Sequence, residues 1–84
     1  PMEISRTICP TLWPANFAGA NMQFAHLRGA DLRGAHLEKS LLADADLREA
    51  NLEGAVFLDA NLTGADLRDA KTDGADFRGA VGVR

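Results

Sequence analysis

The chain has 84 residues with nine basic and twelve acidic side chains, which give a formal net charge of −3. This length predicts one small domain, and so mild a charge neither requires a nucleic-acid partner nor gives the strongly acidic surface of a nucleic-acid mimic. A single cysteine excludes an intrachain disulfide and favours a reducing compartment, so we predict a cytoplasmic protein.

No uninterrupted apolar run approaches the length of a transmembrane helix, so no membrane span is predicted. Residues 1–4 lack the basic and apolar regions of a signal peptide. Because the sequence begins at Pro1, removal of an earlier targeting segment stays an open alternative.

Residues 1–14 precede a regular repeat and are predicted to form an N-terminal cap over it. Ile4 and Ile8 have the i, i+4 spacing of a short helix, which Pro10 would end. Leu12 and Trp13 add large apolar side chains that we expect to cover the first turn of the repeat region. The alternative is a disordered leader.

From residue 15 to residue 79 the sequence repeats every five residues, thirteen times in succession. Position 1 of each repeat is alanine, except at Ser40, and position 2 is most often Asn or Asp. Position 3 is large and mostly apolar: Phe17, Met22, Leu27, Leu32, Leu37, Leu42, Leu47, Leu52, Phe57, Leu62, Leu67, Thr72 and Phe77. Position 5 holds seven of the eight glycines, which predicts a corner that needs permissive backbone angles.

A period of five fits neither a helix nor a flat strand. On a helix, successive position-3 residues would lie about 140° apart and make no apolar stripe. On a strand, the odd period would send them alternately to opposite faces. The pattern therefore predicts an all-β solenoid that bends once per repeat, with positions 1 and 3 facing the axis and positions 2, 4 and 5 facing outward or forming the corner.

The phenylalanines at position 3 indicate four sides per coil. Phe17, Phe57 and Phe77 differ by multiples of twenty, so four repeats per coil place them on one side, where Leu37 completes the column. Residues 80–84 begin a further repeat without a capping segment. We predict that this uncapped C-terminal end pairs with another copy as a homodimer; the alternative is that a longer natural chain continues the coil.

The repeat resembles the pentapeptide-repeat family, whose motif is alanine, then Asp or Asn, then Leu or Phe, then two variable residues. Ala30-Asp31-Leu32-Arg33-Gly34 and Ala65-Asp66-Leu67-Arg68-Asp69 match this motif in full. The resemblance covers residues 15–79 and implies a right-handed quadrilateral β-helix with four repeats per coil. Those residues would then make about three to four coils.

Arg28, Arg48 and Arg68 are twenty residues apart at position 4 and are predicted to form a charged stripe on successive coils. One interpretation is a docking stripe for an anionic partner. We favour a self-neutralised, solvated face, because acidic residues lie at neighbouring positions in the repeat: Asp46, Glu49, Asp66 and Asp69. Direct nucleic-acid binding is not expected, because the acids alternate with the bases.

Apolar side chains at outward positions predict an interaction patch. Its members are Phe24, Leu41, Val56 and Leu58, together with Val81 and Val83 at the C-terminal end. Clustered apolar groups can mark a contact surface. Scattered ones need no explanation, so both interpretations stay open.

No enzyme is predicted, and no catalytic, cofactor-binding or metal-binding residues are assigned. A narrow coil is filled by its own side chains, and His26 and His36 are ten residues apart, on opposite sides of a four-sided coil. We predict a non-catalytic protein-interaction or scaffold module with an unknown protein partner. One alternative is a DNA-mimicking topoisomerase inhibitor, because family members that protect DNA gyrase from quinolones are similar in repeat and shape. Another is a structural spacer within a larger protein.

Overall fold

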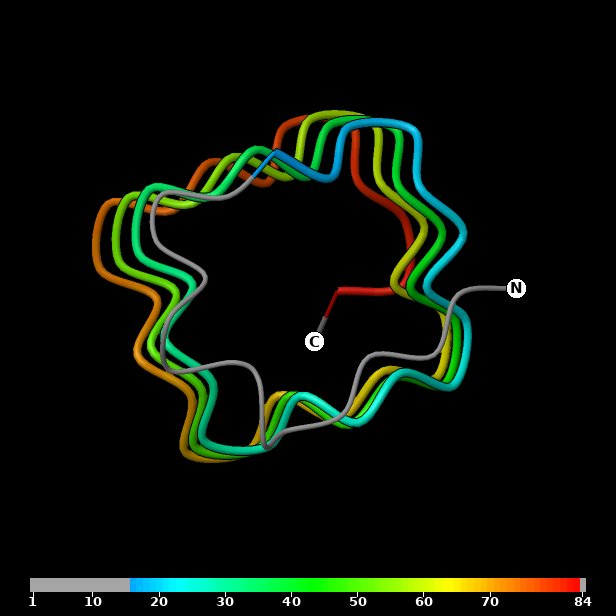
Figure 1. Cartoon of the computed structure of the whole chain (residues 1–84). Coiled ribbons are helices and arrows are strands. Elements are labelled where there is room, and N and C mark those ends of the chain that lie inside the picture. The colour runs from blue at the N-terminus through cyan, green and yellow to red at the C-terminus, as the bar shows by residue number, and fades with distance from the viewer. Residues whose placement is uncertain (1–15, 84) are drawn as a thin grey trace.

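A computed structural model describes residues 16–83 as a stack of similar coils that superpose when viewed along the axis (Figure 1). Within this range the chain forms no helix and no continuous strand, and its β-structure consists of isolated parallel bridges. The predicted N-terminal cap, residues 1–14, lies outside the described residues.

Every bridge joins two position-2 residues that are twenty places apart, so four repeats complete one coil. This confirms the four-sided arrangement expected from the phenylalanine spacing. The bridges define four columns, which we number as sides. Side 1 runs through Asn16, His36, Val56 and Asp76, side 2 through Asn21, Leu41, Asn61 and Val81, side 3 through His26, Asp46 and Asp66, and side 4 through Asp31, Asn51 and Lys71.

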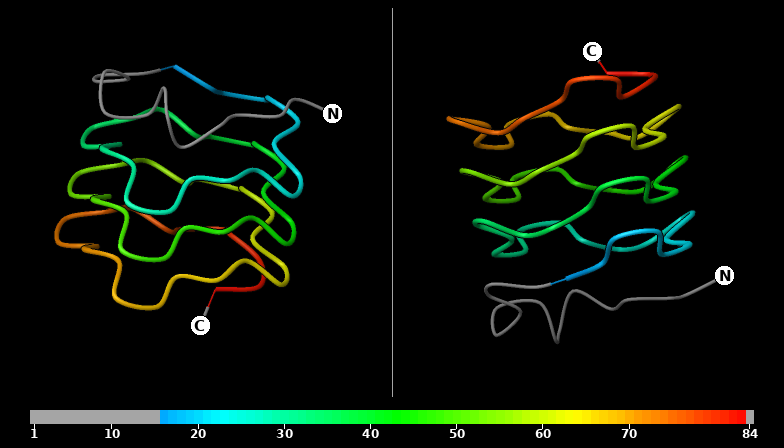
Figure 2. Two further views of the ribbon diagram at one scale, coloured as in Figure 1. Left: turned by 60° about the horizontal axis from the view of Figure 1, so that its bottom comes forward. Right: turned by 90° about the horizontal axis from the view of Figure 1, so that it is seen from above.

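Hydrogen bonds between coils follow the same register in every repeat. In the repeat that contains Leu47, the Leu47 N–H donates to the carbonyl of Asp66 at 2.8 Å, and the Asp46 N–H donates to the carbonyl of Ala25 at 2.9 Å. The Glu49 N–H donates to the carbonyl of Arg68 at 3.0 Å. Each central coil is thus bonded to the coils on both sides of it, and Figure 2 shows the coils as parallel layers.

Alanine and the large residue share the interior, as the pattern predicts. In the central coils the residues at positions 1 and 3 are fully buried, among them Leu47, Leu52 and Phe57. Ser40, the one non-alanine at position 1, is also buried, and its hydroxyl donates to the carbonyl of Leu37 at 2.7 Å. The rings of Phe57 and Phe77 stack with their centroids 4.8 Å apart and an interplanar angle of 8°.

Each corner is a tight turn closed by a hydrogen bond from the residue at position 1 of the next repeat, which is alanine everywhere except at Ser40. The Ala50 N–H, for example, donates to the carbonyl of Leu47 at 3.1 Å. All thirteen position-5 residues have positive φ, between 59° and 76°, as the second central residue of a type II turn does. The corner predicted from the glycines is therefore present at every repeat.

The last coil differs because no described coil packs beneath it. Leu67 and Phe77 are only half-buried, and Thr72 is exposed although it occupies position 3. Within residues 16–83, hydrogen-bond partners are lacking for the backbone N–H groups of Leu67, Asp69, Thr72, Gly74, Phe77 and Gly79. A hollow of about 430 Å³ lies against Gly64–Arg68 of this coil.

Candidate interaction surfaces

The Asn and Asp residues at position 2 cap the corner that follows them. In eight repeats the side-chain Oδ1 accepts a hydrogen bond from the backbone N–H two residues later, at 3.1–3.3 Å. These bonds are Asx turns, which satisfy a backbone donor where the chain bends. The repeat pattern alone predicted only that position 2 faces solvent. The recurrence of Asn and Asp, but not of Ser or Lys, was the signal for this role.

Where arginine follows aspartate by two residues, the two side chains form a closed pair. In Asp46-Leu47-Arg48, the Arg48 Nε donates to Asp46 Oδ1 at 2.9 Å and the Arg48 Nη2 donates to Oδ2 at 2.8 Å. Asp31 with Arg33, Asp66 with Arg68 and Asp76 with Arg78 are paired in the same way. Bidentate pairing of this kind fixes both side chains against the surface.

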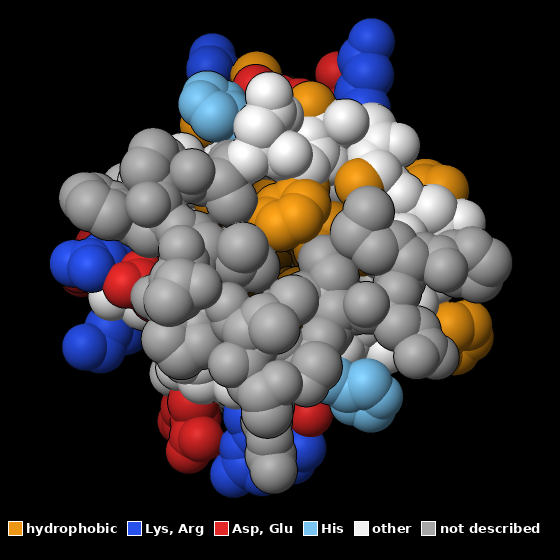
Figure 3. Space-filling view, in the orientation of Figure 1, with side chains coloured by type: hydrophobic (Ala, Val, Ile, Leu, Met, Phe, Trp, Pro, Cys, Tyr) orange, Lys and Arg blue, Asp and Glu red, His pale blue; other side chains and the backbone are white. Residues whose placement is uncertain are grey.

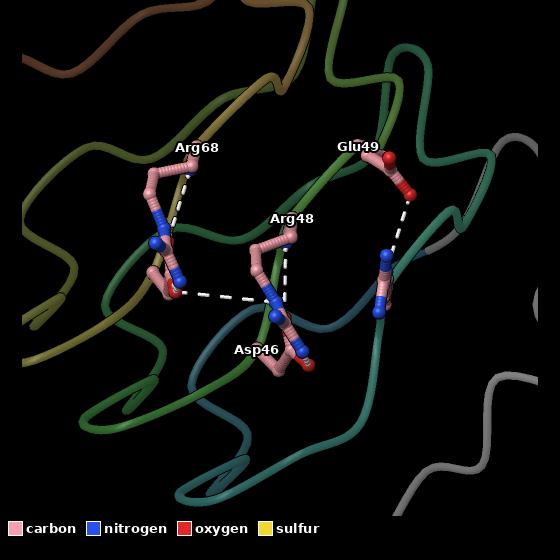
Figure 4. A network of polar contacts seen from close by, with 6 residues as sticks. Asp46, Arg48, Glu49 and Arg68 are labelled. Carbon is pink, nitrogen blue, oxygen red and sulfur yellow. Dashed lines mark hydrogen bonds and ion pairs between the residues drawn. The ribbon is translucent and has the colours of Figure 1, made fainter.

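On side 3 these pairs join into a network across coils (Figure 4). Arg48 Nε lies 3.9 Å from Asp66 Oδ2 of the next coil, which is itself paired with Arg68. Arg28 follows a histidine instead of an aspartate, and its Nε donates to Glu49 Oε1 at 3.1 Å. The predicted stripe of Arg28, Arg48 and Arg68 is therefore present as a column in which each guanidinium contacts a carboxylate.

The pKa values of the aspartates record this pairing. Hydrogen bonds from the Arg48 side chain hold the pKa of Asp46 at about 2, against the opposing effect of partial burial. The corresponding arginines lower the pKa values of Asp31, Asp66 and Asp76. A shallow hollow of about 180 Å³ lies within the stripe, lined by Arg28, Arg48, Glu49, Arg68 and Asp69. Its mixed charges do not favour an anionic ligand.

The predicted apolar patch is divided between two sides. Leu41 and Val81 lie on side 2 and are 37% and 54% exposed, and Phe24, at the far corner of that side, is 64% exposed. Val83 follows on the same side and is 39% exposed. Val56 and Leu58 belong to side 1 and are half-buried, so they contribute less apolar surface than their sequence positions suggested.

The histidines lie on different sides, as their spacing predicted. His26 is on side 3, and His36 is on side 1, where its Nδ1 lies 3.4 Å from Glu38 Oε2. In the part of the chain that the structure describes, no three His, Cys, Asp or Glu side chains come together in a way that could hold a metal ion. Over the same residues, no helix has the length and hydrophobicity needed to cross a membrane.

The family of this chain is indicated by its five-residue repeat, its four-sided register and its capped corners. The family model described as "Pentapeptide repeats (8 copies)" matches residues 15–42 and 40–79. The chain belongs to the pentapeptide repeat family. This confirms the resemblance on which the expected fold depended.

Solved pentapeptide repeat proteins share the fold. A pentapeptide repeat protein from the thylakoid lumen of Arabidopsis thaliana is 22% identical, with a TM-score of 0.64 over 82% of this chain and 62% of its own. One from Nostoc PCC 7120 is 35% identical, with a TM-score of 0.49 over 80% of this chain and 60% of its own. HetL, involved in heterocyst differentiation regulation in Nostoc sp. strain PCC 7120, is 25% identical, with a TM-score of 0.46 over 94% of this chain and 48% of its own.

The likeness to the Arabidopsis thaliana protein implies that this pentapeptide repeat chain is a right-handed quadrilateral β-helix. The chain spans about three fifths or less of the length of these three proteins. No curated protein gave a significant match.

Proposed function

We propose that this pentapeptide repeat chain is a non-catalytic protein-interaction module that associates with a second copy through its last coil. In this proposal residues 1–14 cap the first coil, residues 15–79 form about three to four coils, and residues 80–84 complete the contact surface. The observation that carries the proposal is the open edge of the last coil, where the N–H groups at positions 3 and 5 of repeats 65–79 lack partners within residues 16–83 and Leu67 and Phe77 are half-buried.

An unpaired β edge is a template for another chain, because its N–H and C=O groups gain hydrogen bonds when a second edge docks. The half-buried rings and aliphatic side chains of the last coil would be covered at the same time. The non-catalytic part of the proposal is supported by the buried interior, which is filled mainly by alanine and leucine. It is also supported by the arginines of the stripe, each of which pairs with a carboxylate.

No described feature favours duplex mimicry over this function. A mimic of a nucleic acid needs a continuous acidic surface, whereas the carboxylates of Asp46 and Asp66 are each held by an arginine of the same repeat. A cytoplasmic location remains a prediction from the single cysteine.

Thr72 provides a direct test of the end contact. It lies on the last coil at an inward position but is exposed, so Thr72→Lys should leave the monomer folded. In an end-to-end dimer it would place two ammonium groups near the shared axis. We expect sedimentation-velocity ultracentrifugation to show weaker association of Thr72→Lys by about 30-fold or more.

Ala18→Lys is the matched control, because it adds the same charge at an exposed position of side 1, on the first described coil. Equal association of the wild type, Thr72→Lys and Ala18→Lys would contradict the end contact.

A further inference from the structure

Within residues 16–83, all four of the exposed large hydrophobic side chains belong to side 2. Leu41 and Val81 occupy position 2 of that side, Val83 occupies position 4, and Phe24 occupies the corner that ends it. The clustering is not a consequence of the repeat, since position 2 is Asn or Asp in most other repeats. Side 2 is therefore the face on which apolar surface is concentrated.

Side 2 is also uncharged at its outward positions 2 and 4, although Asp44 occupies its corner on the coil after Phe24. Its outward residues at positions 2 and 4 are Asn21, Leu41, Asn61, Val81, Gln23, Ala43, Thr63 and Val83. Among the residues that the structure describes, each of the other three sides carries acidic and basic groups at these positions. In Figure 3 the right-hand edge, where residues 20–25 run in Figure 1, shows hydrophobic and neutral atoms but no charged ones outside the grey region.

Phe24 adds an independent observation. It has φ of 65° at position 5, where seven of the thirteen repeats have glycine. A bulky side chain is disfavoured in this left-handed conformation, and the phenyl ring is 64% exposed, so it gains little burial in return. Lys39 and Glu49 have a similar angle at other corners, but Phe24 is the one described corner residue with a large apolar side chain, and it extends the apolar surface of side 2 to its corner.

We propose that side 2 is the face on which a second copy of this chain docks, side to side, about a two-fold axis. In a two-fold contact the same surface meets itself. Contacts through sides 1, 3 or 4 would bury charged groups against their own copies, which is costly. Side 2 can be buried on itself without enclosing a charge at positions 2 and 4, with Asp44 at the rim of the contact, whereas a strongly charged partner would find no opposite charge at those positions.

The expected contact is weak. The bridged column from Asn21 to Val81 has four rungs, which at the usual strand spacing rise through only about 14 Å. A flat face of this height is smaller than the roughly 800 Å² that each partner contributes to a standard interface. We therefore expect a dissociation constant in the micromolar to millimolar range.

The inference deepens the proposed self-association by adding a contact that does not use the last coil, so the two must be tested separately. Thr72→Lys serves as the background, because it removes the end contact if there is one. In that background we compare Leu41→Lys, at the second rung of side 2, with His36→Lys, which is exposed at position 2 of side 1 in the preceding repeat. Neither Leu41 nor His36 makes the Asx turn that Asn and Asp make at position 2, so neither substitution removes a corner hydrogen bond and the two can be compared directly.

Sedimentation equilibrium should show dimers of the Thr72→Lys background that Leu41→Lys weakens by about 30-fold or more, while His36→Lys changes the association by less than about threefold. An equimolar mixture of Leu41→Lys and Leu41→Glu chains should recover association, because opposite charges then meet across the axis. Circular dichroism and thermal unfolding of each variant check that the coil is intact.

The outcomes separate the two contacts. If Thr72→Lys alone removes all association, the end contact holds and the side 2 contact is overturned. If association survives Thr72→Lys but fails with Leu41→Lys, the side 2 contact is supported. If the wild-type chain stays monomeric to about 1 mM, both proposed contacts are overturned. Both are also overturned if neither Thr72→Lys nor Leu41→Lys changes the association.

Discussion

Position 5 shows how a single backbone angle shapes the sequence. All thirteen corners require positive φ, but only seven are glycine, and the others are Phe24, Lys39, Asp44, Glu49, Asp59 and Asp69. Aspartate tolerates the left-handed region better than most residues, whereas Phe, Lys and Glu do not. The corners at Phe24, Lys39 and Glu49 are therefore the ones where the chain carries the most conformational strain.

We expect Lys39→Gly to stabilise the chain by roughly 0.5–1 kcal/mol, because glycine relieves the left-handed strain by more than it adds chain entropy to the unfolded state. Conversely, Gly29→Ala should destabilise it by about 1 kcal/mol. A Cβ at Gly29 would have no atom within 4 Å, so the cost there comes from the backbone alone. Urea unfolding followed by circular dichroism measures both differences.

Gly82→Ala is the steric counterpart of Gly29→Ala. A Cβ at Gly82 would collide with backbone atoms of Leu62 and Thr63 on the neighbouring coil, which cannot move aside as a side chain can, so we expect a larger loss than at Gly29. Equal losses at the two glycines would contradict the added steric cost. A Lys39→Gly variant that is less stable than the wild type would contradict the assignment of strain to the corner.

At the scale of one side of a coil, the Asp-x-Arg triplet is a self-contained unit. Asp46 Oδ1 accepts from both the backbone N–H and the Nε of Arg48, at 3.2 Å and 2.9 Å, while Oδ2 accepts from Nη2. One carboxylate thus caps the corner and holds the arginine flat against the surface. An arginine held in this way is less free to reach a distant anion.

The lowered pKa of Asp46 predicts how stability depends on acid. Its folded value of about 2 lies below the usual 3.8, so the folded state binds its proton less readily than the unfolded state. The resulting stabilisation is fully present above about pH 4 and is lost as the pH falls toward 2. Asp31, Asp66 and Asp76 act in the same direction.

Asp46→Asn separates the two roles of the carboxylate. The amide oxygen can still accept the Arg48 backbone N–H, but the ion pair is lost, so the variant should lose less stability between pH 4 and pH 2.5 than the wild type does. Asp46→Ala should be less stable than Asp46→Asn at pH 7 by about 1 kcal/mol, because the corner loses its cap as well. If the free energy of unfolding depends on pH in the same way in the wild type and in Asp46→Asn, the pairing of Asp46 with Arg48 does not stabilise the fold as proposed.

For the whole molecule, the sequence predicted what the repeat controls. The five-residue period predicts the inward alanines and leucines and the four sides of the coil, and the placement of glycine predicts the corners. These features are predictable because each repeat meets the same steric constraints. The Asx turns and the Asp46–Arg48 pairs were not predicted, although their residue types recur, because a hydrogen bond depends on side-chain direction as well as on spacing. The half-burial of Val56 and Leu58 depends on neighbours in adjacent coils, which a single repeat does not reveal.

A stack of coils bonded only to its neighbours should open from its ends. The N–H groups of Leu47 and Leu52 each donate to a carbonyl of the next coil, so their exchange with solvent deuterium requires separation of buried layers. The N–H groups of Leu67 and Thr72 have no such acceptor within residues 16–83. In dilute solution we therefore expect slow exchange in the central coils and fast exchange in the last one, measured amide by amide by NMR.

Raising the protein concentration turns the same measurement into a test of how copies meet. An end contact would give the amides of Leu67 and Thr72 acceptors from another chain and slow their exchange, while side-to-side docking on side 2 would leave these amides fast. Thr72→Lys should abolish any such concentration-dependent protection without altering the slow amides of Leu47 and Leu52, which serve as internal controls. Slow exchange of the last coil even in dilute wild-type monomer would show that its edge is covered within one chain, and the end contact would then lose its physical basis.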